Sequence, residues 1–410
     1  MSFLRTGICV LAAFAVLAHG AVEPWSEAVL EVGAGLLLLV WAWTSWNDSD
    51  VKPVWNPLFL PLLAIWVVAA VQAGAGLSLV PFLTRIEFLK DSALLALFFL
   101  CVQSYRTRVH WRGLVWFLLI LGFSVSLFAI LQHFTWNGKL YWVREMRYGG
   151  MPFGPYVNRN HFAGLMELLI PPGVAVVLLE AERGDKLPFV TLLTLLPIGA
   201  LFLSASRGGI MSFVAEMGLL AILIFLRRRE KKALVTAALI IGLAIVLVSW
   251  LGIGAALERF ASYKSLEVSE GRRVGMLHGS IRIFLDHPVL GTGIGTLQEV
   301  FPRYETVYDG LVVNHSHNDY AEALAETGAL GGICFFAFLA MLFWNAWRFL
   351  VADQDQRNLA YHAGALVACM GMLVHAFVDF NFHIPSNALI FLVLAALATA
   401  ALPMPSQRTR

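Results

Sequence analysis

A histidine motif contains the residues of this chain that are best suited to chemistry. His317-Asn318 is followed, after nine residues, by Gly328-x-x-Gly331, where the polar stretch 252–316 runs into an apolar segment. An imidazole can accept a proton near neutral pH, as a general base that activates a hydroxyl must. The alternative is a histidine that only caps or packs the loop.

The same motif predicts the start of a helix. Ser316 and Asp319 have the spacing of a capping box, and Gly328 is a typical helix end, so we expect a helix from near His317 to about Thr327. The free amides and the positive dipole end of such a helix attract an anion. His317 would then lie at an anion site.

Arginines accompany this motif on the same predicted side of the membrane. Arg207 lies in the segment SASRGG, whose small residues allow a close approach of substrate, and a guanidinium can hold a phosphate with two hydrogen bonds. An arginine at a helix end can instead simply reach for the membrane interface. Arg272 and Arg273 lie in the polar stretch, where a solvated surface is the simpler interpretation.

The amino-acid composition indicates the environment in which the chain folds. The chain is 59% hydrophobic and only 14% charged, with a mean hydropathy of +0.73, whereas a soluble domain is about 45–50% apolar and about 25% charged. This indicates an integral membrane protein. The net charge of +2 and the lack of a basic run interleaved with aromatics argue against nucleic acid binding. Four cysteines fall in apolar stretches and give no evidence of a disulfide or thiolate metal site: Cys9, Cys101, Cys334 and Cys369.

Continuous apolar runs predict helices and not a β-barrel. The fold class that we expect is an all-α polytopic membrane protein with about twelve transmembrane helices and one long periplasmic loop, 252–316, in a single membrane domain over 1–410. The predicted spans are 4–20, 28–46, 57–73, 91–104, 113–134, 161–180, 187–203, 209–226, 233–251, 329–347, 359–379 and 385–402.

Basic residues predict the orientation of these helices. Lysine and arginine recur in alternate short loops, of which 227–232 is the richest, which places these loops and both termini in the cytoplasm. The opposite loops near 21–27, 74–83 and 380–384 contain neither residue. Arginines retained on that disfavoured side therefore suggest an anion site. The first apolar run, which ends near Ala18, also fits a cleaved signal peptide, and its removal would leave the remaining topology unchanged.

Several acidic and histidine patterns could indicate a metal ion. Two acidic pairs resemble those that hold a metal with a nucleotide sugar: Asp48 with Asp50, and Asp353 with Asp355. Both fall in predicted cytoplasmic loops, so we interpret them as solvated turns. His315-x-His317 could begin a zinc site, but no cysteine or third histidine lies nearby in the loop. We therefore expect no metal.

Ionisable residues also occur within or near the apolar segments, where they are costly and usually functional. These residues are Glu167, Glu216, His375 and Asp379. Asp379 and His383, near the predicted outer face, could line an acceptor groove or have partnered structural roles.

The order of the motifs resembles the O-antigen ligase and polymerase superfamily of membrane glycosyltransferases. The resemblance spans about residues 150–390 and does not separate the members of the superfamily. The motifs that carry it are Gly154-x-x-x-Asn158-x-Asn160, Ser206-Arg207-Gly208, Gly271-Arg272-Arg273, Asp286-His287-Pro288-x-x-Gly291-x-Gly293-x-Gly295 and His317-Asn318-x9-Gly328-x-x-Gly331.

This resemblance implies a GT-C-like transferase that takes a glycan from undecaprenyl pyrophosphate and joins it to a hydroxyl of a glycan or lipid acceptor, without a metal or other cofactor. Arg207 and Arg273, or its neighbour Arg272, would bind the pyrophosphate. His317 would be the base, with Asn318 supporting it. The substrate-binding set would also include Asn160. Fixed guanidiniums can stabilise the negative charge that the leaving group gains.

Two classes of function remain. The first is an O-antigen or exopolysaccharide polymerase or ligase in the bacterial inner membrane. The alternative is a transporter of a small anion, in which arginines line a path and membrane carboxylates relay protons. The long loop and the His317 motif favour the enzyme.

Overall fold

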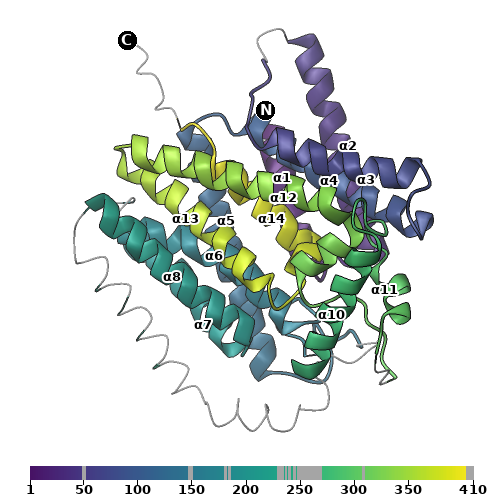
Figure 1. The fold of residues 1–410 in the computed structure, drawn as a ribbon. Helices are drawn as coiled ribbons and strands as arrows, with labels where there is room; N and C mark the ends of the chain where they lie inside the picture. Colours follow the sequence, from purple (N-terminus) through teal and green to yellow (C-terminus); the bar gives the residue numbers. More distant parts are fainter. Residues whose placement is uncertain are drawn as a thin grey trace.

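The computed structural model describes residues 1–48, 52–145, 151–179, 182, 186–228, 270–306 and 310–402, with isolated positions between 229 and 269. Over these residues the chain forms a bundle of helices (Figure 1). The α-helices are α1 (Ser2–Leu17), α2 (Pro24–Asn47), α3 (Phe59–Gly74), α4 (Pro81–Ser104), α5 (Arg108–Phe134), α6 (Arg159–Leu178), α7 (Lys186–Leu203), α8 (Arg207–Arg228), α10 (Glu270–Asp286), α11 (Leu297–Val300), α12 (Asp319–Ala352), α13 (Gln356–His375) and α14 (Pro385–Ala398). Two 3-10 turns are η1 (Phe301–Arg303) and η2 (Asn381–His383).

The apolar segments predicted from the sequence are helical wherever the structure describes them. A helix coincides with each of the eight predicted segments up to residue 228 and with each of the three after residue 318. The segment 233–251 lies almost entirely outside the described residues. Six of the described helices are long and apolar enough to cross a membrane, namely α2, α5, α6, α7, α8 and α12, and α1, α3 and α14 are shorter apolar helices. Over the described residues the all-α prediction is confirmed, and the six candidate spans are consistent with a polytopic membrane protein. The number of twelve spans and the periplasmic location of the loop 252–316 stay predictions.

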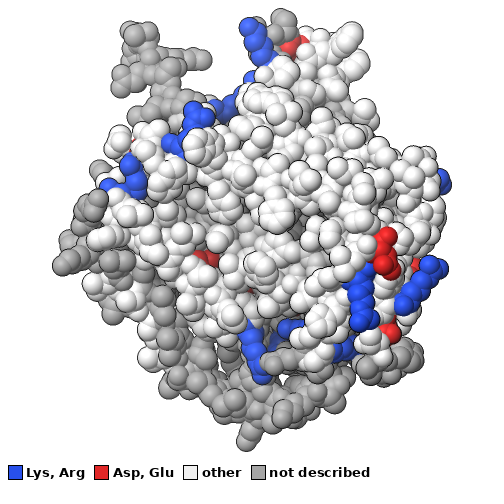
Figure 2. Space-filling model, in the orientation of Figure 1, with Lys and Arg blue, Asp and Glu red and all other residues white. Residues whose placement is uncertain are grey.

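Polar contacts join several helix ends on one face of the bundle. Arg108, at the start of α5, forms an ion pair of 2.6 Å with Asp355, just before α13. Arg227, near the end of α8, donates a 2.8 Å hydrogen bond to the carbonyl of Asp353, just after α12. Figure 2 shows most of the charged side chains near the margins of the view, with a broad uncharged surface between them. Described residues of three loops predicted to be cytoplasmic thus lie on one face, while the starts of α8 and α12 lie at the other ends of their helices.

Helix α6 forms the centre of the bundle and packs against α13. In α6, 89% of the apolar window is buried, although it contains Pro171 and Pro172. Gly364 of α13 faces these prolines, and a Cβ at this position would lie 2.6 Å from the Cα of Pro172. Small residues allow membrane helices to approach closely, and the pair of Glu167 with His375 likewise joins the first half of α6 to the end of α13.

A break in α12 joins it to the preceding glycine-rich turn. Gly328 has a φ of 61°, in the left-handed region, and interrupts the helical hydrogen bonds as the sequence predicted. The turn that contains Gly291 and Gly293 supplies the missing partners. The hydrogen bonds run from Thr292 N to Ala325 O (3.0 Å), Gly293 N to Glu326 O (2.9 Å), Ala329 N to Pro288 O (2.8 Å) and Leu330 N to Val289 O (3.2 Å). Backbone groups freed at the break are therefore satisfied without water.

The described part of the predicted loop is folded. It contains α10, α11 and η1, which bury a small apolar core against the start of α12. This core consists of Met276, Ile283, Leu297, Val300, Phe301, Val313 and Ala325. The polar stretch is thus attached to the segment that carries His317.

Replacing the glycine at the break tests this junction. Gly328→Ala should destabilise the protein by about 1–3 kcal/mol, because the left-handed backbone disfavours a Cβ and the added atom would lie 2.5 Å from the carbonyl carbon of Val289. The midpoint of thermal unfolding in detergent measures this. Gly199→Ala is the matched control, since a Cβ there meets no atom within 4 Å and should change the midpoint little. Equal midpoints for the two variants would contradict the account of the break.

The predicted orientation is tested by labelling introduced cysteines in a chain whose native cysteines are replaced by alanine. A cysteine at Leu311, which is 59% exposed, should react in intact cells with a maleimide that passes only the outer membrane. A cysteine at the exposed Gln354 should react only after the inner membrane is opened. The reverse labelling pattern would contradict the predicted orientation of the helices in the membrane.

Candidate functional site

The N-terminal ends of α6 and α12 meet at the chain that follows α13. The side-chain amide of Asn160, in the first turn of α6, donates to Asp379 Oδ2 at 2.6 Å. The amide of Asp319, the first residue of α12, donates to the carbonyl of Ala376 at 2.9 Å. We call this region, composed of the starts of α6, α8 and α12 and residues 376–380, the helix-end site.

Helix α8 begins at the same place. Ser206 caps it, since its hydroxyl accepts the amide of Gly209 at 3.2 Å. Gly208 packs so closely on α13 that a Cβ there would lie 2.5 Å from Nε2 of His375. Arg207, the first residue of α8, is exposed at this end. Gly208 therefore allows the start of α8 to pack closely on His375, while the close approach of a substrate stays a prediction.

His317 faces a buried carboxylate. Its Nδ1 lies 3.5 Å from Oδ1 of Asp379, whose side chain is only 1% exposed, while the His317 side chain is 13% exposed. The same Oδ1 accepts the amide of Phe380 at 2.8 Å, and Nε2 of His161 lies 3.7 Å away. If the proton of His317 is on Nδ1, directed at this carboxylate, Nε2 is the nitrogen that can accept another.

The charge of Asp379 follows from its neighbours. Burial alone would raise the pKa of its carboxyl, but His161 and His317 hold this pKa well below its usual range. Asp379 therefore remains an anion near neutral pH and can orient an imidazole. A histidine oriented by a carboxylate is a recurrent arrangement for proton transfer.

The predicted capping box is wrong. Helix α12 begins at Asp319, and its cap is Asn318, whose Oδ1 accepts the amide of Ala321 at 2.9 Å. The side chain of Ser316 instead bonds the backbone of Asn318. His317 precedes the helix, with a φ of 51° that costs about 1–2 kcal/mol for a residue with a Cβ. Asn318 also donates to the carbonyl of Phe377 at 3.0 Å, so this residue supports the site by fixing the loop.

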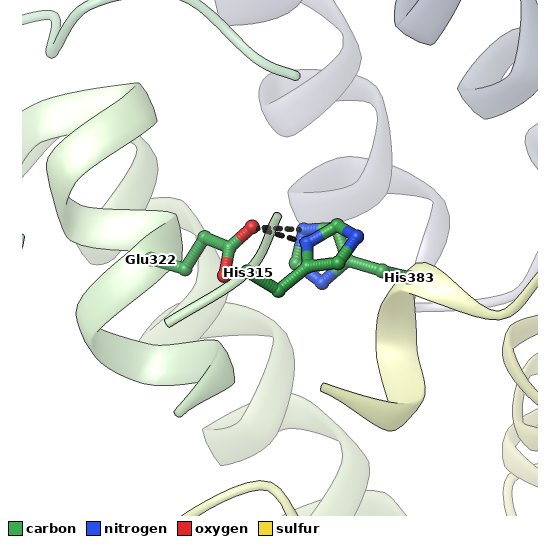
Figure 3. A group of neighbouring side chains, drawn as sticks. All are labelled: His315, Glu322 and His383. Carbon is green, nitrogen blue, oxygen red and sulfur yellow. Dashed lines mark hydrogen bonds and ion pairs between the residues drawn. The ribbon is translucent and has the colours of Figure 1, made fainter. Parts of the chain in front are cut away.

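A second cluster lies beside the first. Glu322 of α12 accepts a 2.7 Å hydrogen bond from Nδ1 of His315, and its Oε1 lies 3.3 Å from Nε2 of His383 (Figure 3). Nδ1 of His383 lies 2.8 Å from Oδ1 of Asp319. Burial alone would lower the pKa of His383, but Glu322 and Asp319 raise it to about 10. Without a bound cation, this imidazole is therefore positively charged between two carboxylates.

Phe380 separates the two clusters. Its ring stacks on His315 with centroids 4.3 Å apart, and it makes edge contacts with His317 at 4.9 Å and His161 at 4.6 Å. The ring of Phe380 therefore lies between His315 on one side and His317 and His161 on the other. Among the described residues, no direct hydrogen bond joins the two groups of histidines.

The two adjacent loop arginines have different surroundings. Arg272 donates from Nη2 to the carbonyl of Leu311 at 2.9 Å. Arg273 lies within electrostatic range of His375, the last residue of α13. Its buried Nε has no hydrogen-bond partner among the described residues. The geometry thus distinguishes two neighbours that the sequence could not.

The acidic pairs lie elsewhere. Asp355 caps α13 by accepting the amide of Arg357 at 2.9 Å and binds Arg108, at the opposite end of α13 from His375. Burial would raise the pKa of Asp355, but the backbone amides that it accepts and Arg108 lower it. Asp50 of the other pair lies outside the described residues. Asp355 is therefore a structural cap in this conformation.

Buried ionisable groups connect the helices below the site. Nδ1 of His375 lies 2.8 Å from Oε1 of Glu167 in α6, and both side chains are buried. Glu216 of α8 is also buried, and among the described residues neither of its carboxyl oxygens has a hydrogen-bond partner. The Glu167–His375 pair ties α6 to α13 just beneath the helix-end site.

The sequence named Asp379 and His383 without assigning their partners. His317 and Asp379 are joined only by the fold, as are His315 and His383, because the polypeptide between them forms α12 and α13. The sequence analysis did not identify His161, although it directly follows Asn160 in a motif that was recognised.

A cavity of about 460 Å³ lies near the opposite ends of the helices and is lined in part by Arg106 and Arg348. None of the predicted site residues lines it.

Residues 192–336 match a family model described as O-antigen ligase. A comparison with curated proteins finds no match. The matched region begins in α7 and ends in α12, so it includes Arg207, Arg273 and His317. Asn160 and Asp379 lie outside it.

Proposed function

We propose that the chain, whose residues 192–336 match the O-antigen ligase family model, belongs to the O-antigen ligase and polymerase superfamily and transfers a glycan from undecaprenyl pyrophosphate onto an acceptor hydroxyl at the periplasmic face of the inner membrane. The observation that carries this proposal is the pairing of His317 with the buried carboxylate of Asp379 at the meeting point of three helix starts. The bacterial inner membrane and the periplasmic orientation of both the loop and the site belong to the proposal.

His317 acts as the general base. Its Nε2 takes the proton of the acceptor hydroxyl, and the hydroxyl oxygen attacks the anomeric carbon of the lipid-linked sugar. The bond from that carbon to the pyrophosphate oxygen breaks, and the leaving group keeps the electron pair. Asp379 stabilises the imidazolium that forms, since its carboxylate faces Nδ1.

Arg207 and Arg273 bind the pyrophosphate and stabilise the charge that it gains. Arg207 stands at the N-terminus of α8, where the helix dipole also favours an anion. We assign the second role to Arg273 and not to Arg272, because Arg272 is engaged by the carbonyl of Leu311. Two guanidiniums can supply the electrostatic stabilisation that a metal gives other transferases, so the transfer needs no metal. Asn160 supports the site through Asp379.

The acceptor can be a glycan, as in a polymerase, or a lipid, as in a ligase. The other candidate, transport of a small anion, has less support. Transporters typically place their polar groups at broken helices near mid-membrane. Here the break at Gly328 is closed by backbone hydrogen bonds, and the histidines gather at helix ends.

The adjacent arginines provide a matched test. Arg273→Lys should lower kcat/KM by about 10- to 100-fold, because an ammonium keeps the charge but cannot form the paired hydrogen bonds of a guanidinium. Arg272→Lys, the control, should stay within about 3-fold of the unchanged protein. The measurement is transfer by purified protein from a synthetic lipid-pyrophosphate donor, and Arg207→Lys should lose most activity too. Equal effects at 272 and 273 would contradict the assignment.

The proton-transfer role and the independence of metal are tested together. His317→Ala should lower kcat by about 10²–10⁴-fold, the usual contribution of general acid–base catalysis. The exposed His278 of α10 gives the control variant, His278→Ala, which should remain active. The unchanged protein should also turn over in excess chelator. Activity that disappears in chelator and returns with magnesium or manganese would refute the metal-free mechanism.

A further inference from the structure

The cluster of His315, Glu322 and His383 has the donor set of a metal site. Each residue presents one ligand atom, and these atoms all lie within 4.8 Å of one another (Figure 3). Two imidazoles and one carboxylate, with a fourth position open, are a known zinc-binding combination. The sequence alone did not predict this site, because His383 lies far along the chain from His315 and Glu322 was not recognised as a possible ligand.

The spacing suits a tetrahedral ion after a small movement. Ligands held about 2.0–2.1 Å from zinc at tetrahedral angles lie about 3.3–3.4 Å apart. Oε1 of Glu322 lies 3.3 Å from Nε2 of His383 and 2.7 Å from Nδ1 of His315. Of these two distances only the second must increase, and the ligand atoms of His315 and His383 lie within 4.8 Å of each other. His315 is the most exposed of the three ligands, with 30% of its side chain accessible, so its ring has room to move.

Neighbouring groups orient the ligands as outer-shell partners do in metal sites. Nδ1 of His383 faces Asp319 at 2.8 Å, which leaves Nε2 directed at Glu322. A carboxylate behind a ligating histidine fixes the ring and makes it a stronger ligand. The second oxygen of Glu322 accepts the amide of Ser316 at 2.8 Å. These contacts position two of the three ligands before any ion binds.

The charge of the cluster favours a cation. Glu322 and Asp319 are buried, with 1% and 6% of their side chains exposed, and both contact His383. Two buried carboxylates need nearby positive charge, which a divalent ion supplies more strongly than an imidazolium. The 17% exposure of His383 and the larger exposure of His315 provide a route for entry.

We propose that His315, His383 and Glu322 bind one divalent transition-metal ion, zinc being the best fit, with Asp319 as the outer-shell partner. The ion is not part of the transfer reaction: Phe380 separates its ligands from His317. It instead fastens the segment before α12 to η2, because His315 and His383 come from these two segments.

Binding is measured on the full-length protein in detergent, purified without a polyhistidine tag and stripped with chelator. Zinc is titrated in competition with a chromogenic chelator, and cobalt is added separately to record its visible absorption. We expect one ion per chain with a Kd of about 10 µM or lower and cobalt bands of tetrahedral intensity. Binding of no zinc at this concentration would mean that the cluster is an ion-pair network only, and it would overturn the proposal.

Variants assign the ligands. His315→Ala and Glu322→Gln should each weaken zinc binding by at least about 10-fold, and Asp319→Asn should weaken it by about 10- to 100-fold, as loss of an outer-shell partner does. His278→Ala is the matched control and should bind as the unchanged protein does. Unaltered zinc affinity in folded His315→Ala protein would overturn the assignment.

X-ray absorption of the zinc-loaded, unchanged protein does not depend on how the variants fold. It should show nitrogen and oxygen neighbours at about 2.0–2.1 Å and no sulfur, whereas sulfur at about 2.3 Å would place the ion at a cysteine and refute this site. Neither measurement uses donor or acceptor. The proposed metal site can therefore be refuted while the proposed transfer activity is supported, and the transfer activity can be refuted while the metal site is supported.

Discussion

A buried carboxylate, that of Asp379, holds the helix-end site together. It accepts hydrogen bonds from Asn160 of α6 and from the amide of Phe380, and it faces the imidazole of His317. An anion with 1% exposure is stable only when such partners replace water, so removing any of them leaves an uncompensated charge. The starts of α6 and α12 and the chain after α13 must therefore meet here for the carboxylate to remain ionised. The positions of His317, the proposed catalytic base, and of its orienting carboxylate follow from that requirement.

Glycines allow the surrounding backbone to reach this arrangement. Gly208 admits His375 beside the start of α8, and Gly328 permits the break in α12 onto which the turn from Pro288 to Gly295 folds. The break divides α12 into a short first part, which bears Asp319 and Glu322, and a long apolar part. Because the turn satisfies the freed backbone groups, the first part can present its polar residues at the site while the rest remains apolar.

The sequence predicted what depends on local pattern. Apolar runs located the ends of most described helices within about five residues, but α4 begins at Pro81, ten residues before the predicted span 91–104, because its first turns carry charged residues. The break at Gly328 was predicted because glycine is a typical helix end. The spacing of Ser316 and Asp319 fits a capping box and therefore predicts Ser316 as the cap of α12. Asn318, however, is an equally good cap residue and caps the helix in the structure. The side chain of Asp319 contacts His383 and so does not complete the predicted capping box. Local spacing cannot decide between two good caps when one of the residues has a distant partner.

Contacts between distant segments could not be predicted in the same way. Nothing in the spacing of His317 indicates that Asp379 faces it, or that His383 completes a cluster with His315. The difference between Arg272 and Arg273 is also tertiary, because it depends on where Leu311 and His375 lie. The residue types indicated which side chains could take part in chemistry. The contacts of those side chains follow only from the packing of α6, α8, α12 and α13.

The most direct test of the central claim is a cryo-electron microscopy structure of the protein with a non-hydrolysable polyprenyl pyrophosphate. We expect the diphosphate at the helix-end site, within hydrogen-bond distance of the guanidiniums of Arg207 and Arg273, and the anomeric carbon on the side of His317. A diphosphate bound instead in the cavity lined by Arg106 and Arg348, at the opposite ends of the helices, would contradict the account.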